Sequence, residues 1–151
     1  MAILIILGVG LGMAYVAGMD SRDLTGGFKL FWFLCALSFG IQILGFLFSS
    51  IFKTESLYDL TGSLTFLSLT FIGLFVNNSP SYIQYMAAFM IVIWTSRLGA
   101  FLFFRILNSG GDSRFDEIKQ SHLKFFVAWL GQGLWVIITA SPLLVLLSKP
   151  V

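Results

Sequence analysis

Five long apolar segments, separated by short polar connections, dominate the pattern along the chain. They cover residues 2–19, 28–52, 57–76, 82–107 and 125–147. Each segment is long for a strand, and none alternates apolar and polar residues as the strands of a membrane β-barrel do. A helix needs about 20 apolar residues to cross a hydrocarbon core of about 30 Å. The pattern therefore predicts an all-α integral membrane protein, a single bundle of about five transmembrane helices over residues 1–151.

The composition agrees with a membrane protein and excludes several other classes. Of the 151 residues, 58% are apolar and only 11% are charged, against about 45–50% and about 25% in soluble domains. The net charge is only +2, and the sequence contains no run of basic residues. We therefore expect no nucleic-acid partner. Cys35 is the single cysteine, which excludes an internal disulfide and a cysteine-based metal site. We expect no bound metal.

The fourth connection, residues 108–124, is the longest and the most highly charged. Ser113, followed by Asp116 and Glu117, fits an N-capping arrangement. The string RFDEIKQSHLK then mixes charged and apolar residues at helical spacing. The sequence predicts a short interfacial helix here, with His122 as a solvated surface residue.

The distribution of Lys and Arg over the connections predicts an orientation. Five basic residues fall on the side that holds the N-terminus and the fourth connection, namely Lys53, Arg105, Arg114, Lys119 and Lys124. Three fall on the other side, namely Arg22, Lys29 and Lys149. The positive-inside rule places the more basic side in the cytosol, or in the matrix or stroma of an organelle. The membrane itself is open among the mitochondrial inner, thylakoid and endoplasmic reticulum membranes.

Four polar residues inside the apolar segments are the candidate site. Arg97 lies near the middle of the fourth segment, where an arginine costs roughly 2.5–3.5 kcal/mol on insertion scales. Counting about 1.5 Å per residue places Gln42 and Gln132 at a similar depth and Asp59 within reach of an extended arginine. We expect a buried polar cluster of Gln42, Asp59, Arg97 and Gln132, with Arg97 paired to Asp59 or else to a glutamine. Such a cluster either holds the bundle together or lines a pocket, and the residues alone leave both open.

Four strings, in this order, resemble a known family: YDLTGSLTF (58–66), WTSRLGAFLFFRI (94–106), GGDSRFDEIK (110–119) and FFVAWLGQGLWV (125–136). Together they resemble the N-terminal half of a branch of the steroid 5-alpha-reductase superfamily that is catalogued as a domain of unknown function. The resemblance covers about residues 57–147. The motif residues that carry it are Tyr58, Asp59, Arg97, Arg105, Asp112 and Arg114.

The resemblance implies an NADPH-dependent reductase acting on a double bond of a sterol-like lipid. In that superfamily a C-terminal half, with a stretch similar to Arg-Tyr-Ser-Arg-His-Pro-Asn-Tyr, holds most of the cofactor. The sequence contains no His-Pro pair before its last residue, Val151. Because hydride transfer belongs to the cofactor, we expect no catalytic residue, no NADPH site and no other cofactor in these 151 residues.

Two functions of different classes remain open. In the first, the chain is a small accessory subunit that packs within a larger membrane complex of respiratory or photosynthetic type. Its partners would be other membrane subunits and bound lipids. In the second, the chain is the substrate-binding half of an NADPH-dependent reductase of steroids or other enone lipids.

Overall fold

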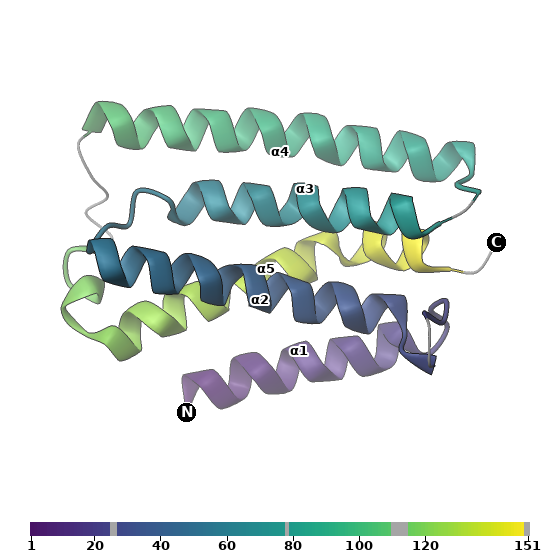
Figure 1. Cartoon of the computed structure of the whole chain (residues 1–151), viewed down its shortest axis with the longest axis horizontal. Coiled ribbons are helices and arrows are strands. Elements are labelled where there is room, and N and C mark those ends of the chain that lie inside the picture. The colour runs from purple at the N-terminus through teal and green to yellow at the C-terminus, as the bar shows by residue number, and fades with distance from the viewer. Residues whose placement is uncertain (25–26, 78, 110–114, 150–151) are drawn as a thin grey trace.

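A computed structural model describes residues 1–24, 27–77, 79–109 and 115–149 of the chain. In these residues the named elements are five α-helices and one short 3-10 helix (Figure 1). In chain order they are α1 (Ala2–Gly18), α2 (Leu30–Phe52), α3 (Tyr58–Val76), α4 (Tyr82–Ser109), η3 (Ile118–Gln120) and α5 (His122–Ser148). The predicted all-α membrane bundle is confirmed.

Four of these helices, α2 to α5, are long and apolar enough to cross a membrane in the part of the chain that the structure describes. The first helix, α1, is apolar but has only 17 residues. At 1.5 Å per residue it is about 26 Å long, less than the hydrocarbon core of about 30 Å. A fifth full span therefore stays a prediction.

The helix α5 lies at the centre of the bundle. It packs against α1, α2 and α3, so that it contacts most of the other helices along its length. The largest core cluster joins Leu30 and Leu34 of α2, Leu69 of α3, and Ile137 and Leu144 of α5. All five of these side chains are completely buried. Burial of apolar side chains between α2, α3 and α5 thus forms the core.

Close approach between α2 and α5 depends on a glycine. The Trp129 ring of α5 lies directly over Gly45 of α2, and a Cβ added at Gly45 would overlap the ring. The same ring packs edge-on against Tyr58 of α3, with the ring centroids 5.1 Å apart. Trp129 is completely buried, so it joins three helices near the end at which the N-terminus lies.

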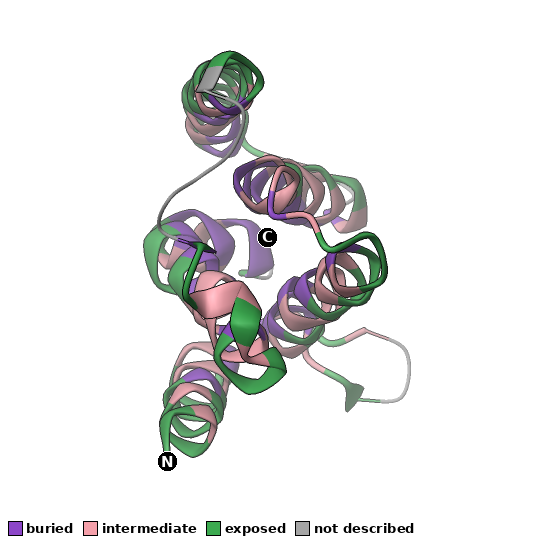
Figure 2. Cartoon of the chain, turned by 90° about the vertical axis from the view of Figure 1, so that its left-hand side faces the viewer, coloured by how far each residue is buried: buried purple, intermediate pink, exposed green. Residues whose placement is uncertain are grey.

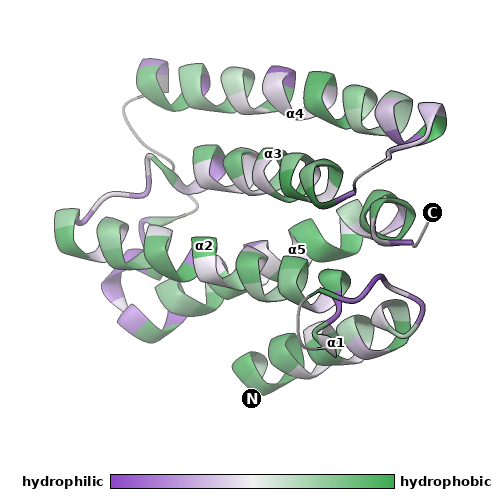
Figure 3. Ribbon diagram, turned by 45° about the vertical axis from the view of Figure 1, so that its right-hand side comes forward, coloured by the Kyte–Doolittle hydropathy of each residue, from purple (hydrophilic) through white to green (hydrophobic). Residues whose placement is uncertain are grey.

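The helix α4 packs on one side only. It contacts α3 along its length and α5 at a few positions (Figure 1). In the end-on view of Figure 2, α4 stands at the top, with its outer surface coloured as exposed. Large apolar side chains occupy that surface, among them Phe89, Met90, Ile93, Phe101 and Phe104. Figure 3 shows the hydrophobic character of the helix, interrupted by a few polar residues.

A polar network ties the helices together at the end that holds the carboxyl ends of α1, α3 and α5. Arg22 donates to the Val76 carbonyl at 3.0 Å and to Asn77 Oδ1 at 3.2 Å. The amide of Asn77 donates to Gln84 Oε1 at 3.0 Å, and Gln84 Nε2 donates to the Leu146 carbonyl at 2.7 Å. The network connects the α1–α2 loop with α3, α4 and α5.

The expected short helix before α5 is present, but its regular part is shorter than the sequence pattern suggests. This part is the three-residue η3, and α5 begins at His122 rather than at residue 125. Phe115 is 4% exposed and packs against Tyr58, at a centroid distance of 4.8 Å. This packing draws the segment into the bundle and shortens the helix that its sequence pattern favours. The expected cap at Ser113 lies outside the described residues.

Candidate functional site

A cavity of about 700 Å³ opens between α3, α4 and α5. Its walls are mainly apolar and aromatic, with side chains such as Phe66, Trp94, Leu98, Trp135 and Val136. Polar side chains also face it, namely Tyr58, Asp59, Ser63, Thr95, Gln132 and Thr139. A largely apolar cavity with a few polar groups is typical of a small-molecule site.

Asp59 lies at one end of the cavity, in the first turn of α3. Its side chain is 9% exposed, and its Oδ2 lies 3.4 Å from Nη2 of Arg105 on α4. The Arg105 side chain is 45% exposed. Because the pair is partly open to solvent, its attraction is screened, and it fixes the relative position of α3 and α4 more than it stabilises the fold.

Gln132 of α5 lies deeper in the cavity, against α3. A Cβ added at Gly62 would lie 2.6 Å from Gln132 Nε2, so a larger residue at position 62 would make the amide shift. The Oε1 atom of Gln132 is buried and has no hydrogen-bond partner in the described part of the chain. Leaving a buried acceptor unpaired costs about 1–3 kcal/mol. Gln132 therefore presents an acceptor that a ligand could satisfy.

Thr95 of α4 provides a second unpaired group on the same cavity. Its side chain is 1% exposed, and no described residue forms a hydrogen bond with its Oγ1. By contrast, the hydroxyl groups of Ser63 and Thr70 on α3 donate to carbonyls four residues earlier in their own helix. Among the described residues that line the cavity, Thr95 and Gln132 are thus the two with a buried side-chain N or O atom that has no hydrogen-bond partner.

Aromatic residues close the cavity at the Asp59 end. Tyr58 donates a hydrogen bond from its hydroxyl to the Ala128 carbonyl of α5 at 3.0 Å. Its ring packs between Phe115 and Trp129. This cluster holds the start of α3 against α5 and fixes the position of the neighbouring Asp59.

The structure separates the four residues expected to form one cluster. Asp59 and Gln132 line the same cavity. Gln42 is completely buried elsewhere, where its Nε2 donates to Thr65 Oγ1 at 2.9 Å. Its own Oε1 has no partner among the described residues.

The expectation for Arg97 is wrong. Its side chain is exposed on α4, and none of the described residues forms a hydrogen bond or ion pair with it. The partner of Asp59 is Arg105 instead. At about 100° per residue, eight residues place Arg97 and Arg105 about 80° apart around the helix, so only Arg105 turns toward α3. The motif residues Asp112 and Arg114 lie outside the described residues.

Thr95, Ser63 and Thr139 are cavity residues that the sequence did not single out. A hydroxyl in an apolar helix gives a weak signal, because it can bond to a carbonyl of its own helix. Thr139 does so, donating to the Trp135 carbonyl at 2.7 Å. Helical spacing is a signal that could have identified Thr95, because Thr95 lies on the face of α4 that Leu98 and Leu102 also present to the cavity.

The cavity can bind an elongated apolar molecule and hydrogen-bond to one polar group on it. Gln132 Oε1 accepts a hydrogen bond, and the Thr95 hydroxyl donates or accepts one. In the described part of the chain no group of three His, Cys, Asp or Glu side chains could hold a metal ion. The arrangement is that of a binding site, and the described residues add no nucleophile–base pair to it.

One family model matches the chain, over residues 45–150. Its description is "Protein of unknown function (DUF1295)". The matched part contains α3, α4 and α5 and therefore every residue that lines the cavity. A comparison with curated proteins and with solved structures gave no significant match.

Proposed function

Because the chain belongs to this family of proteins of unknown function, we propose its function from its surface: it is a small accessory subunit packed within a larger membrane complex. The outer face of α4 supports this proposal. It presents Arg97 among exposed Phe and Met side chains. The complex we propose is of the respiratory or photosynthetic type, in an organelle membrane.

The depth of Arg97 carries the proposal. Arg97 precedes the carboxyl end of α4 by 12 residues, about 18 Å. Arginines near the ends of a membrane helix can extend to the interface, but one this deep must face protein or a water-filled cavity. Since no described residue pairs with Arg97, a neighbouring protein is the partner that fits.

Site-specific photocrosslinking in native membranes tests the subunit proposal. A photoreactive residue at Phe101, on the outer face of α4, should crosslink to another protein. One at Leu44 of α2 serves as the matched control, because the two side chains are 64% and 68% exposed. Crosslinks to lipid alone at Phe101, with the chain migrating as a monomer on native gels, would rule out the accessory role.

A second function is favoured by a separate observation, the cavity between α3, α4 and α5. Its two unpaired polar groups and its volume suit a lipid with one polar end. The resemblance of the motifs to the steroid 5-alpha-reductase superfamily agrees with such a ligand. In this alternative the chain is the substrate-binding half of an NADPH-dependent reductase of steroids or other enone lipids.

The substitution Thr95→Val tests the alternative, because it removes the hydroxyl and keeps the shape of the side chain. An enone steroid titrated into the purified chain should quench the fluorescence of Trp94 and Trp135, which line the cavity. Thr95→Val should weaken this binding by about tenfold, the equivalent of one hydrogen bond of about 1.4 kcal/mol. Thr70→Val is the control, since Thr70 does not line the cavity. Equal affinity of both variants would argue against the site.

A further inference from the structure

A second, smaller cavity, of about 340 Å³, lies between the end of α2 and the start of α5. Its lining residues are mostly polar or basic and come from α2, its C-cap, η3 and α5: Ser49, Ser50, Lys53, Lys119, Gln120, His122 and Phe125. Neither function above uses this cavity. The end of α2 and the start of α5, which line it, lie at the end of the bundle where the N-terminus and η3 also lie (Figure 1).

Two residues of α2 that line this cavity have buried hydroxyl groups without a hydrogen-bond partner among the described residues. Ser49 is 0% exposed. The Oγ atoms of Ser49 and Ser50 are both buried, and neither has a hydrogen-bond partner in the described part of the chain. Ser63, Thr65 and Thr70 of α3 show the usual alternative, a hydrogen bond to a carbonyl four residues earlier. The two α2 hydroxyls are therefore free to bind something else.

Two lysines and the amino end of α5 lie beside these hydroxyls and oppose the partial negative charge at the carboxyl end of α2. Lys53, the C-cap residue of α2, is exposed, and His122 is the first residue of the 27-residue helix α5. The amino end of a helix carries a partial positive charge. None of the described residues that line the cavity is an aspartate or a glutamate.

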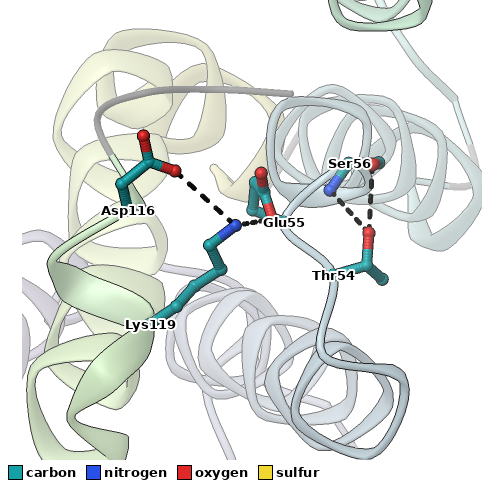
Figure 4. A network of polar contacts seen from close by, with 5 residues as sticks. All are labelled: Thr54, Glu55, Ser56, Asp116 and Lys119. Carbon is teal, nitrogen blue, oxygen red and sulfur yellow. Dashed lines mark hydrogen bonds and ion pairs between the residues drawn. The ribbon is translucent and has the colours of Figure 1, made fainter. Parts of the chain in front are cut away.

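Acidic groups lie beside one of the lysines and balance only part of this charge. Lys119 Nζ lies 2.8 Å from Glu55 Oε2 and 3.9 Å from Asp116 Oδ1 (Figure 4). These pairs hold the Lys119 side chain, which is 31% exposed, at the edge of the cavity. An ammonium group has three donors, so a ligand oxygen can still approach it.

The depth of the cavity matches that of lipid headgroups. Ser49 precedes the end of α2 at Phe52 by three residues, or about 5 Å. With α2 spanning the bilayer, the helix end reaches the headgroup region, which adds about 10–15 Å in total to the hydrocarbon core. Hydroxyl, ammonium, imidazole and amide groups can all donate hydrogen bonds to phosphate oxygens.

We propose that the cavity lined by Ser49, Ser50, Lys53, Lys119 and His122 binds a phosphate group. Two sources share this chemistry, the headgroup of an anionic phospholipid and free phosphate. The buried serines donate to the phosphate oxygens. The two lysines and the amino end of α5 offset part of its charge, and the His122 imidazole can donate a hydrogen bond to it.

Binding to three probes tests the site on the full chain purified in a maltoside detergent. The probes are a short-chain phosphatidylglycerol, diacylglycerol of the same chain length, and inorganic phosphate, with native mass spectrometry as the readout. We expect phosphatidylglycerol to bind at least about tenfold more tightly than diacylglycerol. Inorganic phosphate binding as tightly as the lipid assigns the site to free phosphate, and much weaker binding assigns it to the headgroup. Equal affinity for diacylglycerol and phosphatidylglycerol, or no binding of any probe, overturns the proposal.

Two variants link the binding to these residues. Lys53→Gln should weaken phosphatidylglycerol binding by about tenfold, because it removes one charge-assisted contact. Replacing Ser49 and Ser50 together by Ala should weaken it similarly while leaving the unfolding temperature of the lipid-free chain unchanged or higher, since two unpaired buried hydroxyls are removed. Lys149→Gln, at the other end of the bundle, is the control. If both variants bind phosphatidylglycerol as tightly as the unchanged chain, the lipid binds elsewhere and the proposal is overturned.

Discussion

At the scale of single residues, contact between Gly45 and Trp129 sets how closely α2 approaches α5. The Cη2 atom of the Trp129 ring lies 3.0 Å from where a Cβ at residue 45 would stand, and another ring atom lies closer still. Trp129 is enclosed by Tyr58, Phe125 and the helix backbones. A larger residue at position 45 must therefore displace a ring that has little room to move.

We expect Gly45→Ala to lower the free energy of unfolding by about 1–3 kcal/mol through this overlap. The matched control is Gly40→Ala in the same helix, where a Cβ meets no atom within 4 Å. That substitution should be neutral or stabilising by up to about 1 kcal/mol, because alanine favours a helix over glycine. Thermal unfolding in detergent, followed by circular dichroism, measures both. A smaller effect at position 45 than at position 40 would contradict the close packing.

The direction in which each side chain points around its helix axis also explains which part of the candidate site the sequence could predict. Depth along a helix follows from counting residues, and two of the residues that it singled out, Asp59 and Gln132, line the same cavity. Counting does not reveal which way each side chain turns about the helix axis. Arg97 and Arg105 both fall within reach of Asp59 by depth, and only the packing of α4 on α3 selects Arg105.

At the scale of elements, the helix boundaries were largely predictable. The predicted segments end within about three residues of the helices, because apolar runs and the polar residues between them mark the spans directly. The short helix predicted before α5 is present as η3, which has three residues of 3-10 helix. The amphipathic spacing of this segment favours a longer helix, but the burial of Phe115 against Tyr58 and Phe125 fixes it by contacts distant in sequence.

The contacts of Arg22 hold several elements at the other end of the bundle. We expect Arg22→Gln to lower the free energy of unfolding by about 1–3 kcal/mol, because it removes two charge-assisted hydrogen bonds to the end of α3. Lys29→Gln is a suitable control. Lys29 pairs with the exposed Asp23 at 2.9 Å, and such surface pairs contribute about 0–1 kcal/mol. Chemical unfolding of both variants in detergent measures the difference, and equal losses would show that the Arg22 network adds nothing.

At the scale of the whole molecule, the orientation in the membrane is the main prediction. The N-terminus and the α4–α5 connection lie at one end of the bundle, and the carboxyl end of α5 lies at the other (Figure 1). The positive-inside rule places the first end in the cytosol, matrix or stroma.

Single-cysteine labelling checks this orientation. With Cys35, which is buried, replaced by alanine, Gln120→Cys and Lys149→Cys each introduce one exposed thiol. In sealed vesicles of known orientation, a membrane-impermeant reagent should label Gln120→Cys from the cytosolic, matrix or stromal side and Lys149→Cys from the other. Labelling of both from the same side would refute a bundle in which α5 crosses the membrane.

The short first helix has a consequence for the surrounding lipid. α1 is about 26 Å long and packs against α5, whose 27 residues extend about 40 Å. An untilted α1 that crosses the bilayer beside its longer neighbour leaves a hydrophobic mismatch of about 4 Å against an average hydrocarbon core of about 30 Å. If α1 crosses the bilayer as predicted, the bilayer must thin on the α1 side of the protein, and the thinner endoplasmic reticulum membrane, at about 27 Å, requires less deformation than a thick plasma membrane. We therefore expect bilayer thickness to influence which membranes hold this protein, through the mismatch at α1.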